Sequence, residues 1–204
     1  MLDSGLLQES ITELKKLIRF SGAHAPVCRI VLSIAYNRVG EHQQGIQVLN
    51  ECIKLNPEYP DSYQARGQAL LLQEKYAEAL QDFQRFTTLM PLNGMGFLGV
   101  GDSHKALKQW QAAINSYSKA LSLFPADASA CVLQATLKRG LCYYHLQVYD
   151  HSINDFQAVV RQDVTSIKAH FYIGKILSKR YLQETASQCL GAQKEISQKS
   201  LQQL

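Results

Sequence analysis

The chain has 204 residues, of which 46% are hydrophobic, and a formal net charge of +4. This length and composition suit a substantial hydrophobic core or a stack of about five helix pairs, and no biased run indicates a disordered segment. No stretch approaches the ~20 apolar residues of a membrane-spanning helix, and the mild charge alone gives no indication of nucleic-acid binding.

The charges and cysteines indicate the cellular compartment. Residues 1–163 are neutral, so the whole basic excess lies at 164–204. The N-terminus contains Asp3 and Glu9 and lacks an apolar run, which argues against a signal peptide. The five cysteines are odd in number and form no CxxC pair, so we expect free thiols that pack as small apolar groups. We therefore expect a cytoplasmic protein, with cytoskeletal or ciliary association as a narrower alternative.

Residues 1–25 predict a single amphipathic helix, which begins near Leu6 and ends near Phe20. Its apolar residues recur at helical spacing, namely Leu7, Ile11, Leu14 and Ile18. The helix takes the place of the second helix of an earlier repeat. The chain therefore opens on half a repeat, either as a cap or as the cut end of a longer array.

Residues 60–126 contain one pattern twice. Four residues recur 34 positions later, namely Gly67, Ala79, Phe83 and Pro91 as Gly101, Ala113, Tyr117 and Pro125. A fixed period of this length predicts stacked repeats. Two apolar stripes split by turns at 74–76 and 107–109 predict an antiparallel helix pair in each copy. The small residues permit close approach of the helices, the aromatic residues fill the space between them, and the prolines end the second helix.

This arrangement is similar to the tetratricopeptide repeat family, whose repeats have this length and carry small, small, aromatic and Pro residues at these positions. The resemblance implies an all-α solenoid, a right-handed superhelix of antiparallel helix pairs. It also implies repeats at 26–59, 60–93, 94–127, 128–166 and 167–204, and in the first of these Gly40-Glu41 forms the turn between the helices.

The last two repeats depart from the pattern. The interval from Gly101 to Gly140 exceeds one period by five positions, and this insertion predicts a lengthened first helix in the repeat at 128–166. Val164 stands where Pro is expected, so the second helix of that repeat could run on into the next. The repeat at 167–204 has Gly174 in phase and then fades. We expect it to be degenerate, with a second helix that contains Gly191 and caps the array.

Two short motifs resemble sites of chemistry. Residues 94–99 match GxGxxG, but a nucleotide site requires a preceding strand, whereas Pro91 here follows a helix. These glycines instead predict the softest helix of the array, since each costs a helix about 1 kcal/mol relative to Ala. Cys142 and His145 are three positions apart, but no second pair has metal-ligand spacing. We therefore expect no enzyme activity, no metal and no cofactor.

The family binds partners on a concave surface lined by positions 2, 5, 9 and 12 of each first helix. The resemblance implies a groove that contains Ile30, Ile34, Gln64, Gln68, Leu98, Asp102, Leu137, Leu141, Tyr144, Phe171 and Lys175. Chaperone-binding members hold a carboxylate with Lys at position 5 and Asn at position 9 of one repeat. No repeat here has that pair, so the carboxylate clamp is absent.

We therefore expect a non-catalytic scaffold that binds an apolar or amphipathic segment of a partner protein, with no small-molecule substrate and no membrane. A first alternative is a structural segment of a larger cytoskeletal or ciliary assembly. A second alternative is RNA binding through the basic C-terminal end, which would weaken steeply with salt.

Overall fold

A computed structural model describes residues 4–20, 25–125 and 127–201, and the side chains of 6–20, 25–125 and 127–185. All regular secondary structure in these ranges is α-helical, which confirms the predicted all-α class. The helices form two compact units, residues 1–135 and 136–204.

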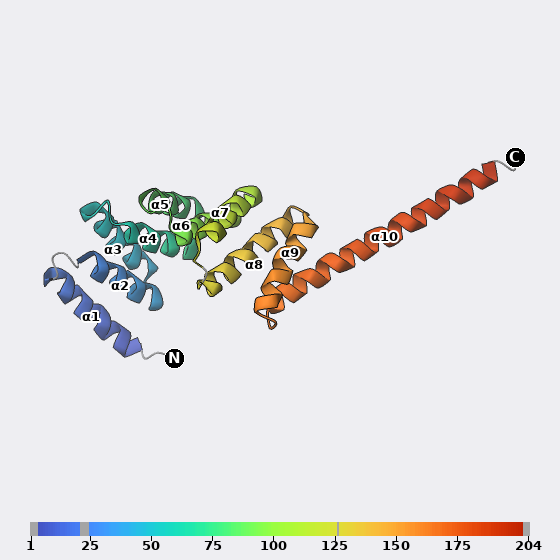
Figure 1. Cartoon of the computed structure of the whole chain (residues 1–204). Helices are drawn as coiled ribbons and strands as arrows, with labels where there is room; N and C mark the ends of the chain where they lie inside the picture. Colours follow the sequence, from blue (N-terminus) through green and yellow to red (C-terminus); the bar gives the residue numbers. More distant parts are fainter. Residues whose placement is uncertain (1–3, 21–24, 126, 202–204) are drawn as a thin grey trace. The chain divides into compact units, whose positions relative to one another are not determined.

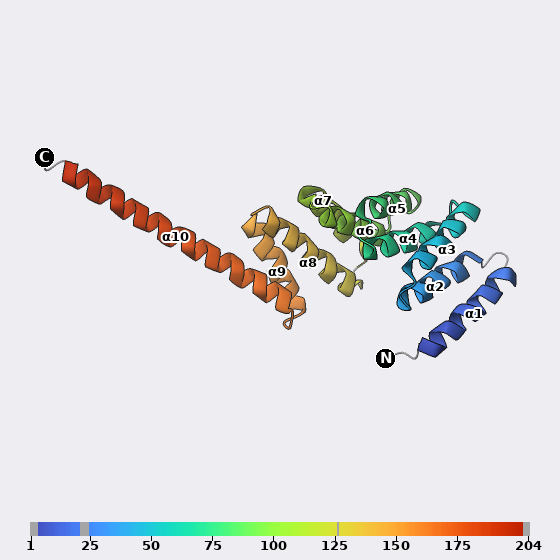
Figure 2. The ribbon, with the colours of Figure 1, turned by 180° about the vertical axis from the view of Figure 1, so that it is seen from behind.

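Unit 1 begins with a single helix that is followed by three helix pairs. The helices are α1 (Ser4–Phe20), α2 (Ala25–Arg38), α3 (His42–Leu55), α4 (Pro60–Leu72), α5 (Tyr76–Leu89), α6 (Gly94–Ala106) and α7 (Trp110–Leu123). Within unit 1 each helix contacts the next (Figure 1). Ile11 of α1 is buried with Leu32 and Tyr36 of α2. The lone helix α1 therefore lies against the first pair (Figure 2).

Unit 2 contains the end of α8 (Ser129–His145), α9 (Tyr149–Gln162) and α10 (Ile167–Leu201). α8 has 17 residues, whereas α4 and α6 have 13 each, so α8 accommodates most of the insertion in its repeat. In the core of this unit Phe156 of α9 and Ile176 of α10 are fully buried.

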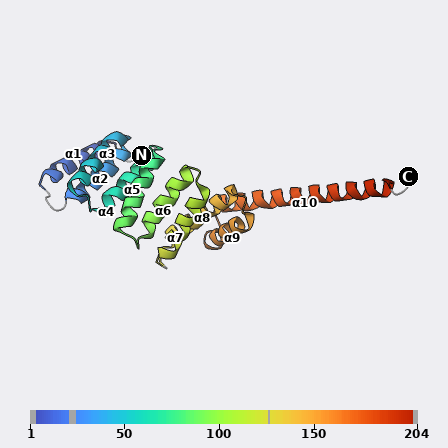
Figure 3. The same cartoon turned by 90° about the horizontal axis from the view of Figure 1, so that it is seen from above.

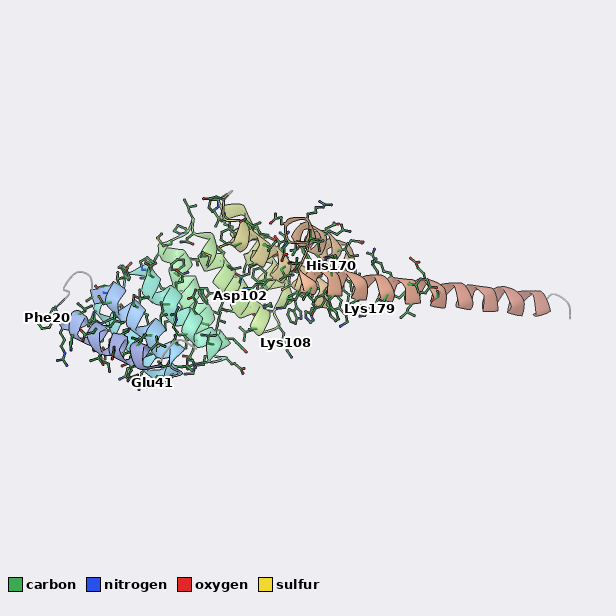
Figure 4. All side chains as sticks on the ribbon, turned by 90° about the horizontal axis from the view of Figure 1, so that it is seen from below. Phe20, Glu41, Asp102, Lys108, His170 and Lys179 are labelled. Carbon is green, nitrogen blue, oxygen red and sulfur yellow. The ribbon has the colours of Figure 1, made fainter. Side chains whose placement is uncertain are left out.

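The first helix of each complete pair ends in the same way. One residue there adopts a left-handed conformation with φ between 58° and 82°, at Gly40, Glu74, Lys108 and Gln147. The next N–H then donates to the carbonyl five positions earlier, as from Lys75 to Leu70 at 2.9 Å. This Schellman motif satisfies carbonyls that the helix leaves unpaired. Glu41 and Lys108, from two such turns, lie along the same edge of unit 1 (Figure 4).

Small residues bring the paired helices close together, as the sequence predicted. A Cβ added to Gly67 would lie 3.0 Å from the Phe83 ring, and one added to Gly101 would lie 2.6 Å from the Tyr117 ring. Ala79 is also completely buried. A larger side chain at these positions would force the helices apart.

The GxGxxG segment lies within α6 and does not form a phosphate loop. Helix α5 precedes it, and the Asn93 side chain caps α6 by accepting a hydrogen bond from the Met95 N–H at 2.9 Å. A Cβ on Gly96 would lie 2.5 Å from the Phe86 ring, and one on Gly99 would overlap the ring of Phe83. These glycines therefore serve close helix packing.

The C-terminal region differs from the prediction at two places. First, α9 ends at Gln162 and does not run on into the next repeat. Asp163 replaces the missing proline as a stop, because its Oδ1 accepts hydrogen bonds from the N–H of Thr165 at 3.0 Å and from its hydroxyl at 2.7 Å. Such a local turn competes with continuation of the helix.

Second, residues 167–201 form one continuous helix, where a fifth helix pair was expected (Figure 3). Tyr181 stands one repeat period after Gln147, at the position where the other pairs have their left-handed residue. A bulky side chain makes that conformation costly, which explains the absence of a turn. Gly191 lies within this helix, and its surroundings fall outside the described side chains.

Candidate partner-binding groove

Helices α2 and α4 enclose a depression of about 660 Å³ on unit 1. Its lining combines apolar side chains with a few polar groups, and consists of Val27, Ile30, Val31, Ser33, Ile34, Asn37, Arg38, Tyr59, Asp61, Gln64, Ala65, Gln68, Ala69 and Leu72. Four of the six residues predicted in this unit, Ile30, Ile34, Gln64 and Gln68, therefore lie in one groove.

The groove exposes several large apolar side chains to solvent. Val27 is 49% exposed, Ile34 is 47% exposed and Leu72 is 71% exposed. A second depression of about 270 Å³ between α1 and α2 shares Val31, Ile34 and Arg38, so the apolar surface continues toward α1. Concave, mostly apolar surfaces with a few polar groups are typical of binding sites.

The other two predicted residues of unit 1 do not join this groove. Leu98 of α6 is only 4% exposed, so its side chain is part of the interior. Helix α6 contains four glycines, so the neighbouring helices approach it closely and cover its larger side chains, including Leu98. Asp102 is half-buried and accepts a hydrogen bond from the Tyr117 hydroxyl at 2.7 Å. Asp102 therefore connects α6 to α7.

In unit 2 the predicted residues form a set with aromatic and basic character. Leu137, Leu141 and Tyr144 of α8 are half-buried, whereas Phe171 of α10 is 59% exposed. The ammonium group of Lys175 lies 5.4 Å from the centre of the Tyr144 ring and 5.6 Å from that of Phe171. Cation–π attraction of this kind holds the lysine against the rings.

A second lysine of α10 extends this arrangement. Lys179 lies 5.7 Å from the centres of the Tyr144 and Tyr149 rings, and its hydrogen bond to the Tyr149 hydroxyl raises the pKa of the lysine. Desolvation, with the nearby charge of Lys175, lowers the pKa of His145. Figure 4 shows His170 at the start of α10 and Lys179 further along it. The amines of Lys175 and Lys179 therefore both lie against the ring of Tyr144.

Two partly buried ion pairs were not predicted from the sequence. Arg66 donates to both carboxylate oxygens of Asp82, at 2.7 and 2.6 Å, and Arg139 binds Asp155 in the same way at 2.9 and 2.7 Å. The hydrogen bond to Asp82 raises the pKa of Arg66. The interval from Arg to Asp along the chain is the same in both pairs, and this repeated spacing was the signal available in the sequence.

A second apolar pocket was also not predicted. It has a volume of about 640 Å³ and lies between the loop before α6 and the loop after α7. Met95 and Cys131 line it, with their sulfur atoms 3.8 Å apart, and the side chain of Leu92 at its rim is 80% exposed. Its lining includes Pro91 and Pro125, which recur one period apart, but a periodic proline in the sequence indicates the end of a helix and does not indicate a pocket.

Other chemistry would require reactive or metal-ligating side chains that lie close together. Cys28, Cys52, Cys131 and Cys142 are free thiols. Among the described side chains no three His, Cys, Asp or Glu residues are grouped so that they could hold a metal ion. No helix in the described part of the chain has the length and apolar character needed to cross a membrane.

Comparison with known proteins identifies the repeats. Residues 48–81 match one family model described as a tetratricopeptide repeat, and residues 29–59 match a second model with the same description. Residues 29–81 therefore contain tetratricopeptide repeats. The matches cover α3, α4 and most of α2, which include both walls of the groove.

Curated relatives share only part of their length with the repeat protein. The CTR9 homolog of Arabidopsis thaliana is 26% identical over 140 residues, which are 68% of this chain and 12% of the relative. Dynein axonemal assembly factor 4 of Rattus norvegicus is 26% identical over 114 residues, which are 54% of this chain and 27% of the relative. The chain therefore spans a small part of the relatives it matches.

Solved structures support the fold. MamA from Desulfovibrio magneticus RS-1 has a TM-score of 0.67 at 19% identity, covering 79% of this chain and 88% of MamA. YrrB, described as a tetratricopeptide repeat protein with an unusual peptide-binding site, has a TM-score of 0.67 at 20% identity, covering 82% of this chain and 84% of YrrB. The repeats and these neighbours together indicate a protein-interaction scaffold.

Proposed function

We propose that this protein is a non-catalytic scaffold whose groove between α2 and α4 binds an apolar or amphipathic segment of a partner protein. The observation that supports this most is the 660 Å³ depression that exposes Val27, Ile34 and Leu72 beside amide side chains. Apolar anchors of a helix or extended segment would displace water from these side chains. Gln64 and Gln68 would hydrogen-bond the polar edge of the segment.

The same groove is poorly suited to an acidic C-terminal tail. Among the residues that line it, Arg38 is the one cation, and it is accompanied by the carboxylate of Asp61. Ile30 and Ile34 stand at the positions where chaperone-binding members have Lys and Asn. A terminal carboxylate would therefore lose its hydration here with few donors to replace it.

A peptide-library selection on the immobilised chain would test this proposal. We expect the selected peptides to carry apolar residues at helical or alternating spacing. Ile34→Glu should weaken the selected peptides by at least about 2 kcal/mol, the scale of a lost interface hot spot. Leu55→Glu is the matched control, since Leu55 is 61% exposed in the same unit but does not line the groove.

Both variants must keep the wild-type circular dichroism spectrum. If Ile34→Glu folds and binds the selected peptides as tightly as the wild-type chain, the groove is not the binding site. Saturable binding of an acidic tail peptide, in place of apolar ones, would contradict the proposed specificity. In unit 2, Leu141→Glu with Tyr144→Ala tests in the same way whether the predicted residues of α8 bind a partner.

A second candidate is a structural role in a larger assembly, and the similarity to dynein axonemal assembly factor 4 supports it. In that case the outer faces and ends would carry the contacts, and groove variants would leave assembly intact. RNA binding through the lysines of α10 is the remaining alternative. Its affinity would fall steeply between low and high salt, whereas apolar peptide binding would change little.

A further inference from the structure

The two walls of the groove, α2 and α4, begin on the same side of unit 1 and run in the same direction. Near the start of both helices the Cys52 thiol of α3 lies 3.1 Å from the Ser62 hydroxyl and 3.8 Å from the Pro26 carbonyl oxygen. At the other end of α4, Ala69 packs in one cluster with Ile46, which lies near the start of α3. The turn at 39–41 joins the end of α2 to that same start. Helix α3 is therefore antiparallel to both walls, and the walls are parallel to each other.

The two charged residues of the groove consequently lie at its opposite ends. Asp61 is in the first turn of α4, whereas Arg38 is the last residue of α2. Asp61 stands one repeat period after Val27, so it lies level with the start of α2, and Arg38 follows Val27 by eleven positions. At a rise of about 1.5 Å per residue, the two charges are about 16 Å apart along the groove.

Both charges are available to a partner. Arg38 and Asp61 are exposed, and neither belongs to any of the ion pairs found among the described side chains. Burial of Tyr59, together with the Asp61 carboxylate that accepts its hydrogen bond, raises the pKa of Tyr59. The phenol therefore stays protonated and holds the carboxylate at this end of the groove.

Between the two charges the groove combines apolar and amide side chains. Val31 and Ile34 of α2 are 44% and 47% exposed, and Gln64 and Gln68 of α4 line the opposite wall. A side-chain amide has both a donor and an acceptor, which are the groups that each peptide unit of an extended chain leaves unpaired. A helix pairs these backbone groups internally. The amides therefore favour an extended ligand over a helical one.

We infer that the groove binds an extended segment with apolar residues at alternate positions, flanked by a basic residue at Asp61 and an acidic residue at Arg38. An extended chain rises about 3.3 Å per residue, so the two flanking charges would be about five residues apart. Complementary charges at both ends select among apolar segments. The inference rests on the proposed function and adds the conformation of the segment, its charges and their spacing.

A series of short peptides tests the charges. The reference peptide is Lys-Leu-Ser-Val-Ser-Glu, and three relatives carry Gln, Lys or Glu at both ends. All are acetylated and amidated, which removes the terminal charges. In calorimetric or NMR titrations at low salt, we expect the wild-type chain to bind the reference about fivefold more tightly than the peptide with two Gln ends. Peptides with two like charges should gain little, because repulsion at one end offsets attraction at the other.

Reversing one charge of the groove should change which peptide binds best. Arg38→Glu makes both ends acidic, so this variant should prefer the peptide with two Lys ends. Asp61→Lys makes both ends basic and should prefer the peptide with two Glu ends. The matched control is Lys119→Glu, which makes the same charge change at an exposed position of unit 1 outside the groove and should keep the preference for the reference. Each variant must retain the wild-type circular dichroism spectrum.

The amide side chains test the extended conformation. Gln68→Leu should weaken binding of the reference about five- to tenfold, because a peptide unit would lose its partner on being buried. Tighter binding to Gln68→Leu would show that the ligand makes only apolar contacts there, and would overturn the extended conformation. A longer peptide with its charges eleven residues apart matches the groove only as a helix. Tighter binding of that peptide than of the reference would also overturn it.

Failure of this inference is distinguishable from failure of the proposed function. If the wild-type chain binds all four peptides equally while Ile34→Glu weakens each of them, the charges do not select the ligand but the groove is still the binding site. If Ile34→Glu binds the peptides as tightly as the wild-type chain does, both the function and the inference are wrong. If Lys119→Glu changes the preference as much as Arg38→Glu, net charge alone explains the selection, and the inference is overturned.

Discussion

The helix pairs α4–α5 and α6–α7 share one repeat pattern but are held together by different contacts. In α4–α5, Arg66 binds both carboxylate oxygens of Asp82 across the interface. The equivalent positions of α6–α7 are Val100 and Ser116, which cannot form an ion pair. There, the Tyr117 hydroxyl of α7 donates to Asp102 of α6 at 2.7 Å. Four glycines also bring α6 against its neighbours, with Gly99 next to the Phe83 ring of α5.

This comparison distinguishes the features that every repeat shares from the contacts that vary between repeats. The features common to both pairs are the Schellman cap, the small residue in the first helix and the buried aromatic ring of the second. These features set the helix lengths and the distance between helices. The contacts that stabilise the interior of each pair vary from repeat to repeat, provided that the close approach is kept.

The largest expected effect comes from removing the ion pair. Asp82→Ala should lower the free energy of unfolding by about 3 kcal/mol, the lower end of the range for breaking a buried pair. The lower end applies because the Arg66 side chain is 24% exposed, so water would partly solvate its charge in the variant. Urea unfolding followed by circular dichroism measures this. Ser116→Ala, at the equivalent position of α6–α7, is the matched control and should change stability by well under about 1 kcal/mol.

A smaller effect that both pairs should share comes from overpacking the close approach. Ala79→Leu and Ala113→Leu should each cost about 1 to 3 kcal/mol, because both alanines are completely buried. Similar losses in thermal or urea melts would confirm that the close approach is common to the two pairs. Wild-type stability for both variants would contradict the repeat phase itself.

The next effect is specific to the contact of α6 with α5. Gly99→Ala should destabilise by about 1 to 2 kcal/mol, since the steric cost of overpacking exceeds the gain of about 1 kcal/mol in helix propensity. Ala65→Gly makes the reverse change at the equivalent position of α4, and its change in stability measures the effect of helix propensity alone. A stabilised Gly99→Ala variant would show that the Phe83 ring can move away at little cost.

Much of the fold could be predicted because small, aromatic and turn residues recur at the repeat period. Turns were expected at Gly40-Glu41, 74–76 and 107–109, and the left-handed residues Gly40, Glu74 and Lys108 lie there. The end of α9 could have been found from Asp163, which forms a local turn with Thr165. The continuous α10 could not be predicted from the period. Gly174 and Ala186 stand at the positions expected of a helix pair, whereas Tyr181 stands at the turn position and disfavours the left-handed conformation that the turn requires.

The groove was predicted only in part, because the family positions give the face of a helix but not its burial. Ile30 and Ile34 line the depression between α2 and α4. Leu98 occupies the same repeat position as Ile30 but is buried. The identity of neighbouring residues decides this difference, since glycines at 96 and 99 draw the surrounding helices toward α6.

The smallest expected effect is a difference in local opening between α6 and α4, measured by hydrogen exchange. α6 contains four glycines and α4 contains one, and each glycine lowers helix propensity by about 1 kcal/mol. Packing offsets most of this deficit, since seven residues of α6 are buried and five of α4.

We therefore expect amides at 94–101 to exchange about three- to fivefold faster than those at 60–67, a difference below about 1 kcal/mol. Comparison of protection factors, corrected for intrinsic exchange rates, is the measurement. Gly99→Ala raises helix propensity but disturbs the Phe83 ring, so faster exchange of α6 in this variant would show that packing outweighs propensity. If exchange in wild-type α6 equals that in α4, the rings of Phe83 and Phe86 compensate fully for the glycines beneath them.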